Sequence, residues 1–111
     1  MIELDKLREI AATYRKYGWE CRRLLLNDRS QPAAIGSIPE FSDIPIFDSA
    51  VPAAWFSRPP ADGAVAWEIR YLGDPPFALV EKLDENEADF EAALGAVEAR
   101  LRDAVSAKRT A

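Results

Sequence analysis

The stretch that decides the fold is residues 53–72, which read AAWFSRPPADGAVAWEIRYL. Apolar and polar side chains alternate along residues 64–72, and this alternation is typical of a strand with one buried face. Residues 53–58 form a shorter apolar strand, and the five residues between the two runs, Pro-Pro-Ala-Asp-Gly, are typical of a turn. We therefore predict a β-hairpin, which makes these two strands antiparallel neighbours.

Two adjacent aromatic residues of this hairpin point to opposite sides of the sheet. Successive side chains of a strand alternate between its faces, so Trp55 and Phe56 cannot enter the same core. Trp67 and Tyr71 share the face of their strand that we expect to meet the helices. One of Trp55 and Phe56 therefore needs a second cover, and the candidates are the connection that precedes the hairpin, a second subunit or a ligand.

The same patterns extend the sheet outward and add a helix at each end. Residues 77–83 follow a Gly-Asp-Pro-Pro turn and complete an antiparallel meander of three strands. Residues 19–26 predict a further strand, whose Leu-Leu-Leu end is apolar on both faces. Apolar residues at three- and four-residue spacing predict helices over 2–17 and 85–106.

Local signals mark the ends of the two predicted helices. Gly18 follows the last periodic residue of the first helix, where a terminating glycine is common. Asp84 or Asn86 is expected to cap the second helix, and Asp84 has the capping-box spacing to Glu87. Gly95 lies inside that helix at a cost of about 1 kcal/mol relative to alanine, so we expect it to mark close packing against the sheet or the first helix.

Residues 32–52 form a long connection of unusual composition. Its prolines exclude a central strand or a long helix, and its large apolar residues argue against disorder. The prolines are Pro32, Pro39, Pro45 and Pro52, and the apolar residues are Ile35, Ile38, Phe41, Ile44, Ile46 and Phe47. We expect an ordered segment that lies across the core, with a short edge strand at residues 44–47. It packs either within its own chain or against a second copy.

Together these elements predict one α+β domain over residues 1–111, with residues 107–111 as a frayed tail. The order is helix, strand, long connection, three strands and helix. We expect both helices to pack on one face of a mostly antiparallel four-stranded sheet. The other face would then present its polar side chains to solvent or to a partner.

The composition excludes several kinds of catalytic and binding site. The 111 residues include no histidine and one cysteine, Cys21, so a Ser-His-Asp or Cys-His site and a four-ligand zinc site cannot form. The formal net charge of −5 disfavours nucleic acid and anionic membranes as partners. No apolar run is long enough to span a membrane and no signal peptide is visible, so we expect a cytoplasmic protein. We predict no catalytic residue, no metal ligand and no cofactor.

Two groups of charged residues have an ordinary interpretation and a functional one. The acidic residues of 81–91 either complement the N-terminus of a helix or bind a cation or a basic partner. Four basic residues bracket the turn between the first helix and the first strand: Arg15, Lys16, Arg22 and Arg23. They either balance nearby acids or hold a phosphate or an acidic partner. We favour the ordinary interpretation of both groups.

The main alternative to a binding role is metal-dependent hydrolysis by carboxylates. Glu68 on its strand, with Asp62 and Asp74 in the flanking turns, would hold the divalent ion. The nearby base is Arg70, whose guanidinium does not lose a proton to act on water. A charge pair on a solvated sheet face is the ordinary interpretation of Glu68. A small-molecule pocket between the connection and the sheet is a third possibility.

The small acidic plan resembles in outline the type III secretion chaperones. It also resembles the double-stranded-RNA-binding domain, from which it departs in charge, in its extra strand and in its lack of a basic loop. The first resemblance implies a dimeric chaperone or adaptor. We favour a non-enzymatic module that binds a protein partner or forms a homodimer, with a candidate interaction surface made of Phe41, Phe47, Trp55 and Phe56.

Overall fold

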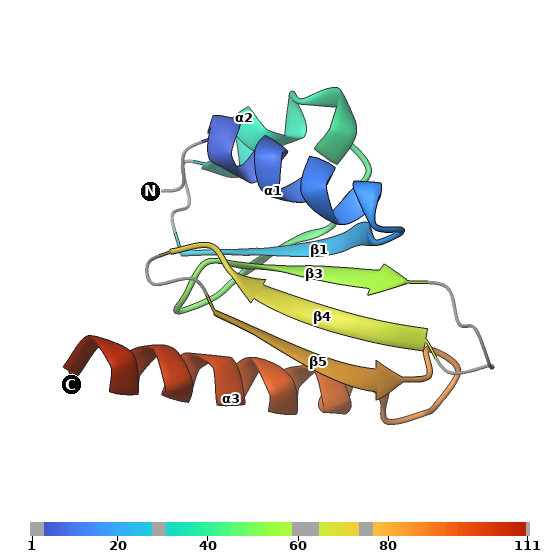
Figure 1. Cartoon of the computed structure of the whole chain (residues 1–111), viewed down its shortest axis with the longest axis vertical. Coiled ribbons are helices and arrows are strands. Elements are labelled where there is room, and N and C mark those ends of the chain that lie inside the picture. The colour runs from blue at the N-terminus through green and yellow to red at the C-terminus, as the bar shows by residue number, and fades with distance from the viewer. Residues whose placement is uncertain (1–3, 28–30, 59–64, 74–76, 111) are drawn as a thin grey trace.

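A computed structural model describes residues 4–27, 31–58, 65–73 and 77–110 of the chain. The elements follow in the order α1 (Leu4–Lys16), β1 (Glu20–Leu26), α2 (Gln31–Gly36), η1 (Pro39–Phe41), β2 (Ile46–Asp48), β3 (Ala53–Arg58), β4 (Val65–Tyr71), β5 (Phe77–Leu83) and α3 (Phe90–Thr110). Figure 1 shows the sheet between two helical layers, with α1 and α2 on one side and α3 on the other. The α+β class is confirmed.

The sheet contains five strands in the order β2-β1-β3-β4-β5. β3, β4 and β5 form the predicted antiparallel meander, in which Trp55 lies opposite Ile69 and Glu68 lies opposite Val80. The fifth strand comes from the connection, because β2 adds itself to the edge of the sheet parallel to β1. The sheet therefore has one strand more than the four predicted. The additional strand is the edge strand expected at residues 44–47, which begins two residues later, at Ile46.

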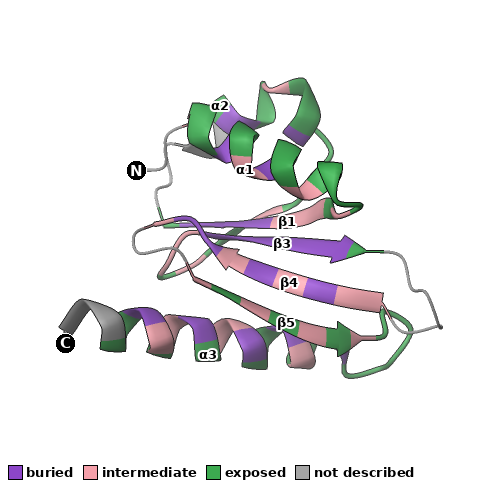
Figure 2. Cartoon of the chain, viewed as in Figure 1, coloured by how far each residue is buried: buried purple, intermediate pink, exposed green. Residues whose placement is uncertain are grey.

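The helices lie on opposite faces of the sheet, so the prediction that both pack on one face is wrong. The reason is β3, whose first five residues are all buried, so that both of its faces need a cover (Figure 2). Trp55 faces α3, and Phe56 faces α1. β4 behaves differently, since burial alternates along it and one face is enclosed.

Each face of the sheet has its own hydrophobic core. The core under α3 consists of Leu25, Ala53, Trp55, Trp67, Ile69, Tyr71, Phe90, Leu94, Val97, Leu101 and Val105. The core under α1 consists of Leu7, Ala11, Leu24, Leu26, Ile35, Phe41, Ala54, Phe56 and Leu72. The Leu-Leu-Leu end of β1 serves both cores, as its composition on both faces predicts.

The proline-punctuated connection packs within its own chain. It folds into α2, η1 and β2 and sends Ile35 and Phe41 into the core under α1, where they are 0% and 1% exposed. Pro39 occupies the first turn of η1, where a residue without a backbone N–H is tolerated. The connection thus joins α1 in covering Phe56.

The helix ends agree with the sequence at α1 and differ at α3. Gly18 ends α1 with a φ of +89°, and the Trp19 N–H reaches the Tyr14 carbonyl at 2.9 Å. Asp84 does not cap α3: its carboxylate accepts the Asn86 N–H at 2.9 Å in a turn that precedes the helix. The helix begins later than predicted, at Phe90, and runs to Thr110, because no glycine or proline interrupts the stretch expected to fray.

Candidate functional site

The four aromatic residues of the predicted interaction surface do not form one. Phe41, Trp55 and Phe56 are 1%, 0% and 0% exposed, because α1, the connection and α3 cover them within the same chain. Phe47 alone remains at the surface, with 44% of its area exposed. The surface expected from sequence therefore reduces to one residue on β2.

A β-bulge near the start of β1 places two arginines on the α3 side of the sheet. The register with β3 shifts between Cys21, which lies opposite Phe56, and Arg23, which lies opposite Trp55. Arg22 donates to the Ser57 hydroxyl at 3.0 Å and to the two Glu85 oxygens at 3.3 and 2.8 Å.

The second of these arginines is held by a carboxylate at the start of α3. Arg23 forms a bidentate pair with Glu91 at 2.9 and 2.5 Å. The hydrogen bond between them raises the pKa of Arg23 and lowers that of Glu91. These contacts agree with the ordinary interpretation, in which the arginines balance acids near the second helix. They hold the first turn of α3 and the segment before it against β1.

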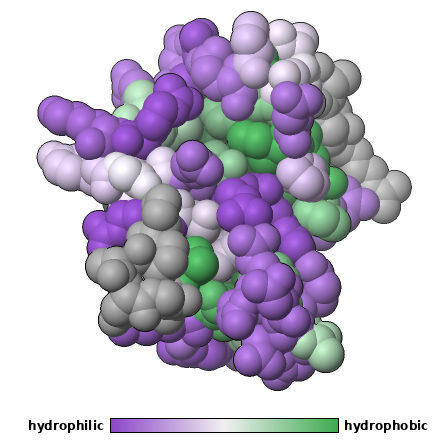
Figure 3. All heavy atoms as spheres, turned by 90° about the vertical axis from the view of Figure 1, so that its right-hand side faces the viewer, coloured by the Kyte–Doolittle hydropathy of each residue, from purple (hydrophilic) through white to green (hydrophobic). Residues whose placement is uncertain are grey.

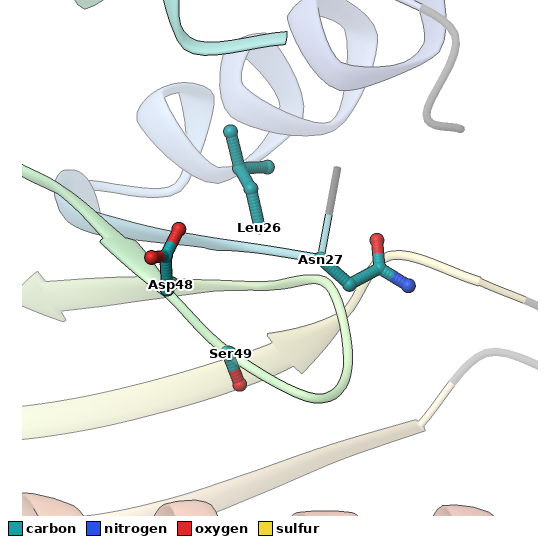
Figure 4. Close-up of a pocket in the computed structure, with 4 residues that line it drawn as sticks. All are labelled: Leu26, Asn27, Asp48 and Ser49. Atoms are coloured by element: carbon teal, nitrogen blue, oxygen red, sulfur yellow. The ribbon is translucent and has the colours of Figure 1, made fainter. Parts of the chain in front are cut away.

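A groove runs between α3 and the β1–β2 edge of the sheet. We call it the α3 groove; it has a volume of about 220 Å³ and is lined by Arg23, Leu25, Phe47, Asp48, Glu91, Leu94, Gly95 and Glu98. The side chains of Leu25 and Leu94 are 4% and 1% exposed and form an apolar floor. Figure 4 shows the Asp48 carboxylate pointing away from α3, so the acids facing the groove come from the helix.

Gly95 keeps the α3 groove open at its helical wall. A Cβ built at Gly95 would meet no atom within 4 Å, so the expectation that this glycine allows close packing is wrong. The helix nevertheless carries the conformational cost of a glycine at an exposed interior position. On the opposite wall the Arg23 guanidinium lies 5.3 Å from the Phe47 ring centre and 5.8 Å from that of Phe90.

Glu98 supplies a positioned carboxylate beside the apolar floor. The buried indole of Trp55 donates its N–H to a Glu98 oxygen at 2.8 Å, which holds the side chain from below. Arg102 lies four residues further along the helix, but among the described residues it forms no ion pair with Glu98. Arg23 pairs with Glu91, so it does not neutralise Glu98 by an ion pair of its own, and the acids that line the groove outnumber its single base.

A second hollow lies at the end of the sheet where β1 begins. It has a volume of about 290 Å³ and is lined by Cys21, Arg22, Arg23, Asp43, Ile44, Pro45, Trp67 and Glu85. Figure 3 looks onto this end and shows hydrophobic residues between hydrophilic ones. Its charged groups largely neutralise one another, and burial raises the pKa of the Cys21 thiol to about 12, which leaves it unreactive at neutral pH. The buried Trp67 indole N–H has no hydrogen-bond partner among the described residues.

A third hollow of about 290 Å³ lies at the carboxyl ends of β1 and β2. Its lining residues are Leu26, Asn27, Asp48 and Ser49. Figure 4 shows their side chains pointing in different directions, with Leu26 directed toward α1. Because the polar groups do not converge, this hollow offers no ligand a set of simultaneous contacts.

Of the three proposed metal ligands, Glu68 is the one that the structure describes. Glu68 accepts a hydrogen bond from the Tyr14 hydroxyl, and Tyr14 stacks on Phe56 with ring centres 3.9 Å apart. Asp62 and Asp74 lie outside the described residues. In the part of the chain that is described, no three acidic, cysteine or histidine side chains form a cluster suited to a metal ion.

None of the helices in the described ranges combines the length and apolar character needed to cross a membrane. Comparison of the chain with models of protein families, with curated proteins and with solved structures finds no match in any of the three.

Proposed function

We propose that the chain is a non-enzymatic protein-interaction module whose α3 groove receives a basic segment of a partner protein. The observation that carries the proposal is Gly95, which leaves open space above an apolar floor although alanine would favour the helix. Positions where a sequence departs from the locally favoured residue are often functional. The charged side chains that line the α3 groove determine which kind of segment it would bind.

The charge of the α3 groove selects the class of segment. Glu98 is held in place by Trp55, and Arg23 compensates Glu91 on the same wall. A lysine or arginine of the partner would lay its aliphatic stem on Leu25 and Leu94 and direct its charge to Glu98. The chain's net charge of −5 attracts a basic partner once the two proteins approach within about one Debye length.

A pair of synthetic peptides tests this proposal. One peptide contains leucine and lysine, and the other has the same length with glutamate in place of lysine. We expect the lysine peptide to shift the backbone amide NMR signals of Phe47, Leu94 and Gly95, and the glutamate peptide to leave them unchanged. Binding anywhere else on the molecule, such as the acidic turn before α3, contradicts the proposal.

Three variants locate the contact. Gly95→Leu fills the α3 groove, and Glu98→Gln removes the charge while keeping an oxygen for the Trp55 N–H; each is expected to weaken binding of the lysine peptide about tenfold, which corresponds to about 1.4 kcal/mol. The matched control is Ala92→Leu, which adds the same side chain at an exposed position outside the groove. Equal affinities of Gly95→Leu and Ala92→Leu for the peptide would refute the assignment.

A further inference from the structure

The edge of the sheet opposite β2 is formed by β5, a seven-residue strand paired on one side with β4. α3 covers one of its faces, where Leu79 and Leu83 pack against the core. The other face is open: Ala78, Val80 and Lys82 are all exposed, and Val80 exposes 56% of its area. Such an edge is a template for a further strand, since its outer backbone groups are directed away from the sheet.

We propose that β5 pairs antiparallel with β5 of a second copy, about a two-fold axis at Val80. This register opposes Val80 to itself and uses all seven residues. It places Lys82 opposite Ala78 and Glu81 opposite Leu79, so that no charged residue faces a like charge. Moving the axis one residue toward the end of the strand would oppose Glu81 to itself, which like-charge repulsion disfavours.

The neighbouring side chains are compatible with this register. Glu81 is already paired with Arg100 of α3 at 2.7 Å, which reduces its repulsion of the second Glu81 placed diagonally across the interface. On the open face, the two valines would form an apolar cross-strand pair at the centre. Because α3 lies on the same side of both copies, the two helices would extend one layer over a continuous ten-stranded sheet.

The size of the contact predicts how strong the association is. Seven residues span roughly 24 Å, and a strip about 10 Å wide gives roughly 240 Å² per partner, well below the roughly 800 Å² of a standard stable interface. Each copy also carries a net charge of −5, so the copies repel at long range. We therefore expect a weak dimer that depends on protein concentration and that strengthens when salt screens the charge.

Charge exchange at Val80 tests the proposal. Sedimentation at protein concentrations up to about 1 mM is expected to show a wild-type monomer–dimer equilibrium. In a dimer of Val80→Lys, or of Val80→Glu, two like charges would face each other across the axis. Each variant by itself is therefore expected to lose at least tenfold in self-affinity, whereas a mixture of the two variants is expected to form heterodimers. Circular dichroism verifies that each variant folds, as an exposed site should allow.

The mixture distinguishes self-pairing at Val80 from other causes of association. A wild type that stays monomeric throughout the concentration range refutes the dimer. Variants that dimerise as well as the wild type place the contact elsewhere, and monomeric variants that fail to associate on mixing refute the two-fold register. None of these results depends on the α3 groove, which lies at the opposite edge of the sheet, beside β2.

Discussion

The two helical layers of this small protein are built in different ways and leave different parts of the sheet open. The layer on the α1 side is assembled from α1, α2 and η1 and covers β1 and β3, but it leaves one face of β4 partly exposed and the same face of β5 open (Figure 2). The layer on the other side is the single helix α3, which leaves the α3 groove beside β2. The two open regions lie diagonally across the sheet, and each is the consequence of a layer too narrow to cover five strands.

The strongest test of the two-layer arrangement is truncation of the two aromatic residues on β3. Trp55→Ala and Phe56→Ala remove fully buried rings from opposite cores, so each is expected to lower the free energy of unfolding by about 3–5 kcal/mol. Urea unfolding followed by circular dichroism measures both. The control is Phe47→Ala, whose half-exposed ring is expected to cost about 1 kcal/mol or less. A small effect at either β3 position would mean that one layer does not cover β3.

A medium effect is expected at the contact between the α1 layer and the half-buried face of β4. Tyr14→Phe removes the hydrogen bond to Glu68 and is expected to cost about 1 kcal/mol at neutral pH. Burial, followed by the Glu68 contact, raises the pKa of Tyr14 above its ordinary value of 10.0. The folded state therefore resists ionisation of this phenol, and its contribution to stability is present below pH 10 and is lost as the pH rises above it.

Urea unfolding at about pH 8 and about pH 11 measures this dependence. The wild type is expected to lose more stability over this range than Tyr14→Phe does. Tyr17→Phe is the matched control, because Tyr17 is 65% exposed and should show the wild-type loss. If Tyr14→Phe and the wild type lose the same stability between the two pH values, Tyr14 does not link the α1 layer to β4 in solution.

The smallest effect, and the one of opposite sign, is expected at the wall of the α3 groove. Gly95→Ala gains helix propensity and meets no atom within 4 Å, so it is expected to raise the free energy of unfolding by about 0.5–1 kcal/mol. The reverse change at a neighbouring exposed position, Ala96→Gly, is expected to lower it by a similar amount. Destabilisation by Gly95→Ala would mean that the groove is closed at this point.

The candidate site could be predicted only in part, and the failures have a common cause. The sequence identified Phe47 as apolar and unexplained, and it identified Gly95 as locally unfavourable. It grouped Phe47 with Phe41, Trp55 and Phe56, because exposure cannot be derived from the apolar character of a residue alone. Glu98 was missed as a groove residue, since its role depends on an indole 43 positions away in the chain.

The sequence by itself determined the local elements of the fold. Apolar runs bounded by turn residues gave the bounds of β3 and β5 to the residue, and the meander followed from its short turns. The adjacency of Trp55 and Phe56 already required two covered faces. The missing histidine removed several catalytic mechanisms whatever the fold.

Only the tertiary structure decided which element covers which face. An amphipathic helix carries the same periodic signal whichever side of a sheet it packs on, so α1 and α3 could not be assigned to faces from their sequences. The β1 bulge, which turns Arg22 and Arg23 toward the same side, likewise depends on pairing with β3. Local periodicity determines how a segment folds, whereas the partner of its apolar side is set by contacts between residues far apart in the chain.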